Sequence, residues 1–314
     1  MPPNHDKMLL ITAEMLRTGD FHVVARAISL VENAGPGAEE LLKSLQHTHV
    51  PLIGITGPPG AGKSTLSDAL IKQFTEDGKK LAILCVDPSS SFHSGAILGD
   101  RIRMNRWYNN PSVFIRSLSS RGTMGGLNPR IFQITDILAQ AGFDYILIET
   151  VGVGQAEVDI SRLADQVVLV LVPESGDDIQ TMKSGIMEIG DIFVVNKSDR
   201  PGAEQFLHSL KSSIHYQTNK PADEIKFIQT IATEEKGIAE LYKAIRESAA
   251  RISPGRSLKL LTQKAWQLIA GYRMRDVDNN KLYNALEEAA GDPDFNIYRF
   301  AESVSMASGL QKSQ

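Results

Sequence analysis

The sequence contains a single cysteine, Cys85, among 314 residues. One thiol cannot form an intrachain disulfide, and it cannot supply a zinc site that is built from four cysteines. A chain of this length without disulfides favours a reducing compartment.

The sequence also lacks a long apolar run and an excess of positive charge. Runs such as Val167 to Val172 are far shorter than the roughly 20 apolar residues that a membrane-spanning helix needs. The net charge of −4 provides no overall basic balance of the kind typical of nucleic-acid binders. The N-terminus has acidic residues within a helical pattern, and it has no basic stretch followed by a long apolar one. We therefore expect a cytoplasmic protein with neither a membrane nor a nucleic-acid partner.

The chain reads as three parts. Residues 5–48 show helical apolar spacing broken by short turns, which predicts two or three short helices. After Pro51, seven short apolar runs alternate with helical segments: LIGIT, KLAILCVD, SVFIRSL, YILIET, QVVLVLV, DIFVVN and KFIQTIA. Continuous apolar strands between helices are typical of an α/β fold with a mostly parallel sheet and helices on both faces. From Ser253 the spacing is helical again, so we expect three regions: 1–49, 50–252 and 253–314.

The first run leads into a phosphate-binding motif. The nine residues after LIGIT fit the pattern G-x-x-x-x-G-K-[ST] between a strand and a helix, and they are Gly57, Pro58, Pro59, Gly60, Ala61, Gly62, Lys63, Ser64 and Thr65. The glycines let successive N–H groups point at phosphate oxygens, and the following helix presents its positive end to the same anion. Lys63 supplies charge for the terminal phosphates, and the Ser64 hydroxyl is placed to bind Mg²⁺. The sequence therefore predicts a P-loop NTPase.

A second motif predicts that the bound nucleotide carries guanine. The run DIFVV ends in Asn196, Lys197, Ser198 and Asp199, which fits N-K-x-D. A carboxylate at Asp199 can accept from both the ring N–H and the amine of guanine, whereas adenine offers no such pair of donors, and an unpaired buried polar group discriminates strongly. Lys197 would lie along the nucleotide. The guanine oxygen would accept from the backbone of the loop Ile231, Ala232 and Thr233.

Three carboxylates fall at strand ends or in the loops that follow them: Asp87, Asp100 and Glu149. A parallel sheet gathers such loops at its carboxyl edge, beside the phosphate loop. Mg²⁺ keeps several waters, so we expect one or two direct carboxylate contacts in addition to Ser64. Glu149 is followed by Gly152 in a carboxylate-x-x-Gly pattern, which together with Lys63 predicts the catalytic centre.

Longer stretches resemble one family. VDPSSSFHSGAILGDRIRM, FIRSLSSRGTMGG, ETVGVGQAEVDI and VLVPESGDDIQTMKSGIMEIGDIFVVNKSD are similar to signature stretches of the MeaB/ArgK/MMAA GTPases. The resemblance implies a GTPase chaperone of an adenosylcobalamin-dependent acyl-CoA mutase, notably methylmalonyl-CoA mutase. It implies that GTP binding and hydrolysis are coupled to cofactor loading, protection or reactivation, with adenosylcobalamin belonging to the partner enzyme.

The same resemblance assigns residue roles. It implies Mg²⁺ at Ser64, Asp87, Asp100 and Glu149, with GTP or GDP as the nucleotide. It implies that the loop 174–183, with Asp177, Gln180 and Lys183, is a switch that passes the nucleotide state to the mutase. The guanine loop IATEEKGI departs from the family, which more often has serine before the alanine. The C-terminal helices match weakly, and a homodimer through them is an expectation.

The stretch LIETVGVGQ, residues 147–155, contains a displaced glutamine. In Ras-like GTPases the glutamine that orients water follows the carboxylate-x-x-Gly directly, whereas here two residues precede Gln155. We therefore expect slow intrinsic hydrolysis, because the barrier stays high without an oriented water or a supplied cation.

Other functions remain open at this point. A metal-insertion GTPase would need histidine or cysteine clusters, whereas this chain has one cysteine and seven scattered histidines, with His93 the nearest candidate. A kinase of the transport-system type would need an acceptor pocket and a base, and N-K-x-D argues against it. A scaffold with an inactive nucleotide site is disfavoured, because Lys63, Ser64 and Glu149 are all present.

Overall fold

The computed structural model describes residues 11–87, 104–119, 127–150, 156–175, 184–217, 225–251, 254–275, 277–292 and 295–309. The chain divides into two compact units, Met1–Leu260 and Leu261–Gln314. Within the described part of the chain, no helix is both long enough and apolar enough to span a bilayer.

The centre of the first unit is a seven-stranded sheet with the order β3-β2-β4-β1-β5-β6-β7. Its neighbouring strand pairs are parallel. The strands are β1 (Leu52–Thr56), β2 (Leu81–Asp87), β3 (Val113–Ser119), β4 (Tyr145–Thr150), β5 (Gln166–Leu171), β6 (Ile192–Asn196) and β7 (Lys226–Thr230). All seven apolar runs of the sequence therefore form strands, and the predicted parallel sheet is confirmed.

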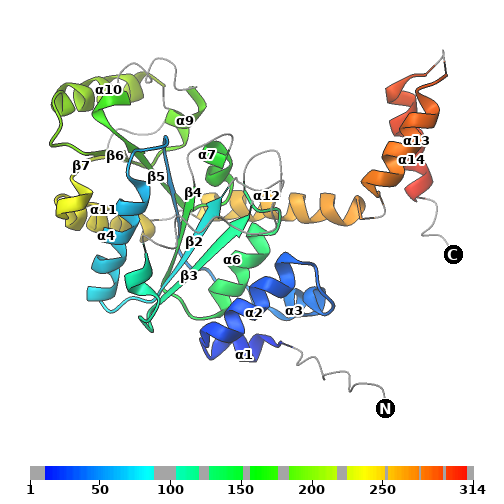
Figure 1. Ribbon diagram of the computed structural model, residues 1–314, viewed down its shortest axis with the longest axis horizontal. Coiled ribbons are helices and arrows are strands. Elements are labelled where there is room, and N and C mark those ends of the chain that lie inside the picture. The colour runs from blue at the N-terminus through cyan, green and yellow to red at the C-terminus, as the bar shows by residue number, and fades with distance from the viewer. Residues whose placement is uncertain are drawn as a thin grey trace. The chain divides into compact units, whose positions relative to one another are not determined.

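Helices cover both faces of this sheet (Figure 1). On one face, alternate strand residues such as Ile53, Ile83 and Val170 pack with α4 (Lys63–Glu76) and α11 (Ile238–Ala249). On the other face, Leu84 and Ile148 belong to a core shared with α6 and the N-terminal helices. A third cluster joins β5 and β6 to α10. Because both faces are covered, central strands such as β1 and β5 are buried along their whole length, whereas the edge strands β3 and β7 also carry polar residues.

The remaining described elements connect the strands. The helices are α6 (Ile131–Gln140), α7 (Ala156–Asp159), α9 (Ser184–Ile189) and α10 (Ala203–Gln217). Short 3₁₀ turns are η1 (Asn105–Trp107), η2 (Ile160–Arg162), η3 (Pro173–Ser175) and η4 (Ala232–Glu234).

Three short helices precede the sheet, as the sequence predicts: α1 (Ala13–Arg17), α2 (Phe21–Glu32) and α3 (Ala38–Ser44). The Asp20 side chain accepts a hydrogen bond from the His22 N–H and so begins α2. At the other end of α2, Glu32 accepts from Arg116 of β3 at 3.2 Å. This contact joins the N-terminal helices to the edge strand of the sheet.

The C-terminal helices are α12 (Pro254–Arg273), α13 (Asn279–Ala289) and α14 (Ile297–Gly309). Helix α12 begins in the first unit, where Arg256 donates two hydrogen bonds, of 3.0 and 2.9 Å, to the carboxylate of Asp191. Within the second unit, Asp278 caps α13 by accepting from the N–H groups of Asn280 and Lys281. Several large apolar side chains of this unit are exposed, among them Trp266 at 74% and Tyr298 at 82%.

Candidate nucleotide site

The phosphate loop connects the carboxyl end of β1 to α4, in the middle of the sheet. Gly57 and Gly62 both have positive φ, at +141° and +87°. A Cβ at Gly57 would stand 2.1 Å from the backbone oxygen of Val170, and a Cβ at Gly62 would stand 2.4 Å from Nδ2 of Asn196. Glycine is therefore required at both positions by backbone conformation and by close approach.

The Lys63 ammonium lies inside the loop that it terminates. Its Nζ donates to the backbone oxygens of Gly57 at 2.7 Å and Pro58 at 3.0 Å, and the residue is only 6% exposed. The loop thus encircles a buried positive charge at the N-terminus of α4. This arrangement suits an anion, because the helix end and the ammonium both attract negative charge.

Glu149 lies beside Ser64, as the magnesium prediction requires. Glu149 is the second-last residue of β4, paired in register with Ile55 of β1, which places its side chain at the carboxyl edge next to the phosphate loop. The Ser64 hydroxyl donates to Glu149 Oε1 at 2.5 Å, and both residues are buried, at 7% and 5% exposed.

A hydroxyl and a carboxylate are the oxygen ligands that Mg²⁺ prefers, so these two residues fit the ion. Among the described side chains there is no cluster of three histidine, cysteine, aspartate or glutamate residues that could hold a metal by itself. When bound, Mg²⁺ would neutralise phosphate charge at this edge. The Asp87 side chain and all of Asp100 lie outside the described residues, so their predicted part in the site stays a prediction.

The Asn196 side chain joins three segments. Its Nδ2 donates to the Ala61 oxygen at 2.8 Å, and its Oδ1 accepts from the Thr230 hydroxyl at 3.0 Å and the Ala232 N–H at 3.2 Å. Asn196 is 2% exposed. Its described contacts are therefore with the protein, where it fixes the spacing between the phosphate loop and the predicted guanine loop.

Lys197 and Asp199 complete this side of the site. Lys197 has φ +57° and donates through Nζ to the Gly60 oxygen at 2.7 Å, so the base motif is tied to the phosphate loop twice. Asp199 is exposed, which leaves its carboxylate accessible to a base. A hydrogen bond to Glu234 raises the pKa of Lys236, and the charge of Asp199 raises it further, which keeps a cation near the guanine loop.

The guanine loop itself is tightly turned. It follows β7, and an antiparallel bridge from Ile231 to Lys236 closes it. At its end, a Cβ on Gly237 would stand 2.1 Å from the Gln229 oxygen. Ala232 is buried, whereas Thr233 is exposed. These contacts therefore hold the backbone of the loop in one conformation beside Asn196.

Several contacts of the site are not predicted by any sequence motif. The hydroxyl of Thr150, at the end of β4, donates to that of Thr56, at the end of β1, at 2.9 Å. Arg200 pairs with Glu174, the first residue of the predicted switch loop, and this hydrogen bond lowers the pKa of Glu174. Gly152, Gln155, Asp177, Gln180 and Lys183 lie outside the described residues.

Comparison with known proteins decides the family. The family model described as methylmalonyl-CoA mutase-associated GTPase MeaB matches residues 24–281. This chain belongs to the MeaB family of GTPases. It is 46% identical over 239 residues to a putative GTPase of Pyrococcus abyssi, covering 74% of each chain. It is 32% identical over 280 residues to the GTPase ArgK of Escherichia coli, covering 86% of this chain and 85% of that one.

Two further similarities extend the comparison of this MeaB-family protein. A fused isobutyryl-CoA mutase of Geobacillus kaustophilus is 35% identical over 250 residues, which cover 74% of this chain and 23% of that protein. The crystal structure of a LAO/AO transport system kinase matches with a TM-score of 0.65 over 93% of this chain and 96% of its own, at 24% identity, which supports the fold. The predicted family, P-loop fold and GTPase activity are thus confirmed.

Proposed function

We propose that this GTPase is a chaperone of an adenosylcobalamin-dependent acyl-CoA mutase, with methylmalonyl-CoA mutase as the first candidate. GTP binding and hydrolysis would control loading, protection or reactivation of the mutase, and the cobalamin would belong to the mutase. The observation that carries the proposal is the fused relative, because a segment similar to 250 residues of this chain occurs there within one protein named as an acyl-CoA mutase. The family description names a mutase as well.

The geometry supports a GTPase, and the sequence supports the proposal that it needs a partner. Ser64, Glu149 and Lys63 are arranged to hold phosphate and Mg²⁺, and we propose the sequence-predicted site residues in these roles. In the sequence, Gln155 stands two residues later than the water-orienting glutamine of Ras-like GTPases. A mutase that orders Asp177, Gln180 and Lys183 would then accelerate hydrolysis, because a partner shifts an equilibrium by its differential affinity for the two states.

The test is single-turnover GTP hydrolysis with and without candidate acyl-CoA mutases, together with mutase binding in GTP and in GDP. We expect acceleration and nucleotide-dependent binding for the wild type. Alanine at Asp177, Gln180 or Lys183 should reduce the acceleration, whereas nucleotide affinity and basal turnover should stay near wild type. If no mutase changes the rate or binds in a nucleotide-dependent way, the chaperone proposal fails and the GTPase assignment remains.

We also propose a cytoplasmic homodimer that uses the second unit. Trp266, Ile269 and Tyr272 are spaced by three residues along α12, and each is at least half exposed. Side chains three residues apart on a helix are neighbours, and contiguous exposed apolar surface marks an interaction site. Light scattering on the purified full-length protein distinguishes a dimer from a monomer.

A further inference from the structure

The phosphate loop is fixed to the strands on both sides of it. Toward β6 and β7, Asn196 of the base motif donates to the Ala61 oxygen at 2.8 Å. Toward β4, the Thr150 hydroxyl donates to the Thr56 hydroxyl at 2.9 Å, a contact to which no sequence motif assigns a role. Both threonines are fully buried, at 0% exposed. Because a buried hydroxyl is costly to leave without a partner, this pair holds the two strand ends at one separation.

Each threonine is the last residue of its strand and adjoins a residue of the site. Thr56 ends β1 and precedes Gly57, where the phosphate loop begins. Thr150 ends β4 and follows Glu149, whose Oε1 accepts from the Ser64 hydroxyl at 2.5 Å. Neighbouring residues of a strand point to opposite faces of the sheet, so the threonine pair lies on the face opposite to Glu149 and α4. The end of β4 is therefore bound to α4 on one face and to β1 on the other.

These links form a closed ring around the start of the phosphate loop. Consecutive members of the ring are joined by a hydrogen bond or by the chain itself, and in order they are Ser64, Glu149, Thr150, Thr56, Gly57 and Lys63. The hydrogen bonds of the ring measure 2.5, 2.9 and 2.7 Å. The threonine bond is the one among them in which neither partner is predicted to contact phosphate or Mg²⁺. It can therefore be removed without removing a predicted ligand group.

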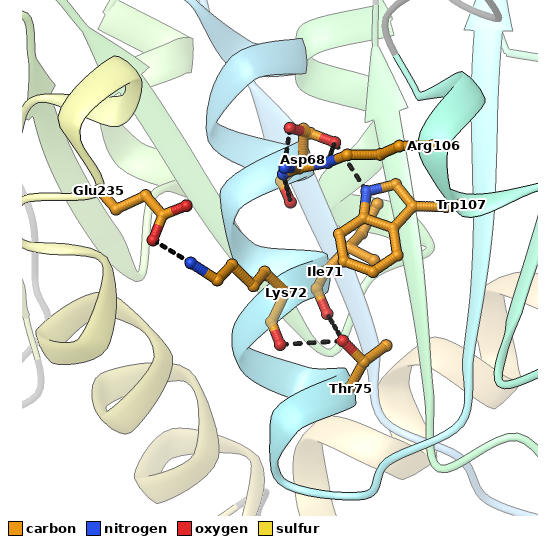
Figure 2. Close-up of polar contacts among 7 residues, drawn as sticks. All are labelled: Asp68, Ile71, Lys72, Thr75, Arg106, Trp107 and Glu235. Carbon is orange, nitrogen blue, oxygen red and sulfur yellow. Dashed lines mark hydrogen bonds and ion pairs between the residues drawn. The ribbon is translucent and has the colours of Figure 1, made fainter. Parts of the chain in front are cut away.

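Helix α4 is held in place by contacts that do not involve this ring, as Figure 2 shows. Asp68 accepts from Arg106 Nε at 2.9 Å and from Trp107 Nε1 at 2.7 Å, which binds the helix to η1. Lys72 donates to Glu235, directly after η4, at 2.5 Å. Loss of the threonine bond should therefore leave α4 in place and affect the end of β4.

We propose that Thr56 and Thr150 are positioning residues for the magnesium side of GTP hydrolysis. Their hydrogen bond holds the end of β4 at the separation from the phosphate loop at which Glu149 and Ser64 meet. This role rests on the proposed function of Glu149 and Ser64 at Mg²⁺. Loss of the bond should weaken the response to Mg²⁺, whereas the guanine side, which Asn196 holds, should be unaffected.

The first test is Thr150→Val in the full-length protein. Valine has nearly the shape of threonine and lacks the hydroxyl, so it removes the bond to Thr56 with little change in packing. We expect the Mg²⁺ concentration for half-maximal single-turnover hydrolysis to rise about three- to tenfold, the range for one neutral hydrogen bond. GDP affinity in EDTA should change by less than about twofold, because the base motif keeps its contacts. Thr56→Val should give the same result.

The double variant, Thr56→Val with Thr150→Val, separates positioning from stability. Each single variant should unfold at a lower urea concentration, because one hydroxyl is left without its partner, whereas the double variant should recover toward the wild type. Its magnesium dependence should stay shifted, because the link is still missing. The double variant also provides the test if a single one fails to fold. A wild-type magnesium dependence in the double variant would reduce the pair to a structural role and overturn the proposal.

Thr150→Ser is the rescue, because serine keeps the hydroxyl that donates to Thr56 and loses only a methyl group. It should show the magnesium dependence of the wild type, even if the loss of the methyl group lowers its stability. A shift as large as that of Thr150→Val would mean that packing, rather than the hydrogen bond, sets the magnesium response, and the proposal would fail.

Thr75→Val is the matched control, since it makes the same chemical change on α4. The Thr75 hydroxyl donates to the backbone oxygens of Ile71 and Lys72, both at 2.9 Å, so its bonds stay within the helix (Figure 2). Thr75 lies about three helical turns from Ser64. The control should change neither the magnesium dependence nor GDP affinity. A shift equal to that of Thr150→Val would show that the effect is not specific to the ring and would overturn the proposal.

Glu149→Gln distinguishes this proposal from the proposed magnesium role itself. It removes the carboxylate charge and keeps the shape, so it should raise the Mg²⁺ requirement about tenfold or more, beyond the effect of either threonine variant. An effect in Glu149→Gln without one in the threonine variants would overturn the positioning role alone. A wild-type magnesium dependence in Glu149→Gln would overturn both, because the threonines act through Glu149.

Discussion

The two units of the chain treat their apolar residues in opposite ways. In the first unit, consecutive residues of β5 such as Val168, Leu169 and Val170 are fully buried, because helices cover both faces of the sheet. In the second unit, Trp266 and Tyr298 are among the most exposed large side chains described. The first unit therefore completes its own core, whereas the second leaves large apolar side chains exposed, as the proposed dimer requires.

Alanine in place of one glycine in each unit should give the largest contrast. Gly57→Ala places a Cβ 2.1 Å from the Val170 backbone, whereas a Cβ at Gly271, in α12, meets no atom within 4 Å. We expect Gly57→Ala to abolish nucleotide binding and to lower the free energy of unfolding by about 3 kcal/mol or more. Gly271→Ala should raise it by about 1 kcal/mol through helix propensity. Calorimetric GDP titration and urea unfolding measure both, and similar effects of the two changes would break the comparison.

A change at Asp199 should alter which nucleotide the first unit binds and leave the packing of the protein unchanged. Asp199 is exposed, and asparagine is nearly isosteric with it. Asp199→Asn exchanges an acceptor for a donor, so GTP affinity should fall about 10²-fold or more while the affinity for xanthosine triphosphate rises. Binding of GTP, ATP and xanthosine triphosphate by calorimetry checks this. Comparable GTP and ATP affinities in the wild type would contradict the guanine prediction.

The helical layer over the sheet should lose stability at alkaline pH. Burial, followed by a hydrogen bond from the Tyr242 hydroxyl to Asp77 at 2.5 Å, raises the pKa of Tyr242 from 10.0 to about 12. A raised pKa in the folded state means that this contribution is complete below pH 10 and is lost as the pH rises to about 12. Urea unfolding of the wild type should therefore lose on the order of 2 kcal/mol more than Tyr242→Phe over this window. Parallel pH profiles of the two proteins would contradict it.

The smallest effect on nucleotide binding should come from the second unit. Trp266→Glu places a charge on its exposed apolar side, so the proposed dimer should dissociate in light scattering. GDP affinity should stay within about twofold of wild type, because the nucleotide motifs all lie in the first unit. An unchanged mass would show that this side chain is not at an interface.

The sequence predicts the parts of this molecule that depend on local pattern. The seven strands follow from short apolar runs, and the phosphate loop follows from glycines at fixed spacing before Lys63. The sequence also predicts that Glu149 lies near Ser64, because parallel strands end at one edge, whereas the direct hydrogen bond between them is seen only in the structure. The domain limits and the roles of the site residues stay predictions.

Other contacts of the site join residues that are far apart in the sequence and follow no motif. Asp68 and Arg106 are 38 positions apart, and their contact depends on how η1 packs against α4. The pairing of Glu174 with Arg200 depends in the same way on two neighbouring loops. Asn196 was predicted through its motif for guanine, whereas its part as a buried link between Ala61, Thr230 and Ala232 needed the geometry.

The lone cysteine can be used to measure how often the protein opens around the sheet. Cys85 is 2% exposed in β2, in register between Ser117 of β3 and Glu149 of β4. The Cys85 side chain lies in the core between the sheet and helices α4 and α11, so a thiol reagent reaches it only when this core opens, and the labelling rate of the native protein measures that opening. Because Glu149 is the neighbour of Cys85 on β4, any ligand held at the carboxyl edge of the sheet should slow the labelling of Cys85. Mass spectrometry of the single labelled site would measure this rate.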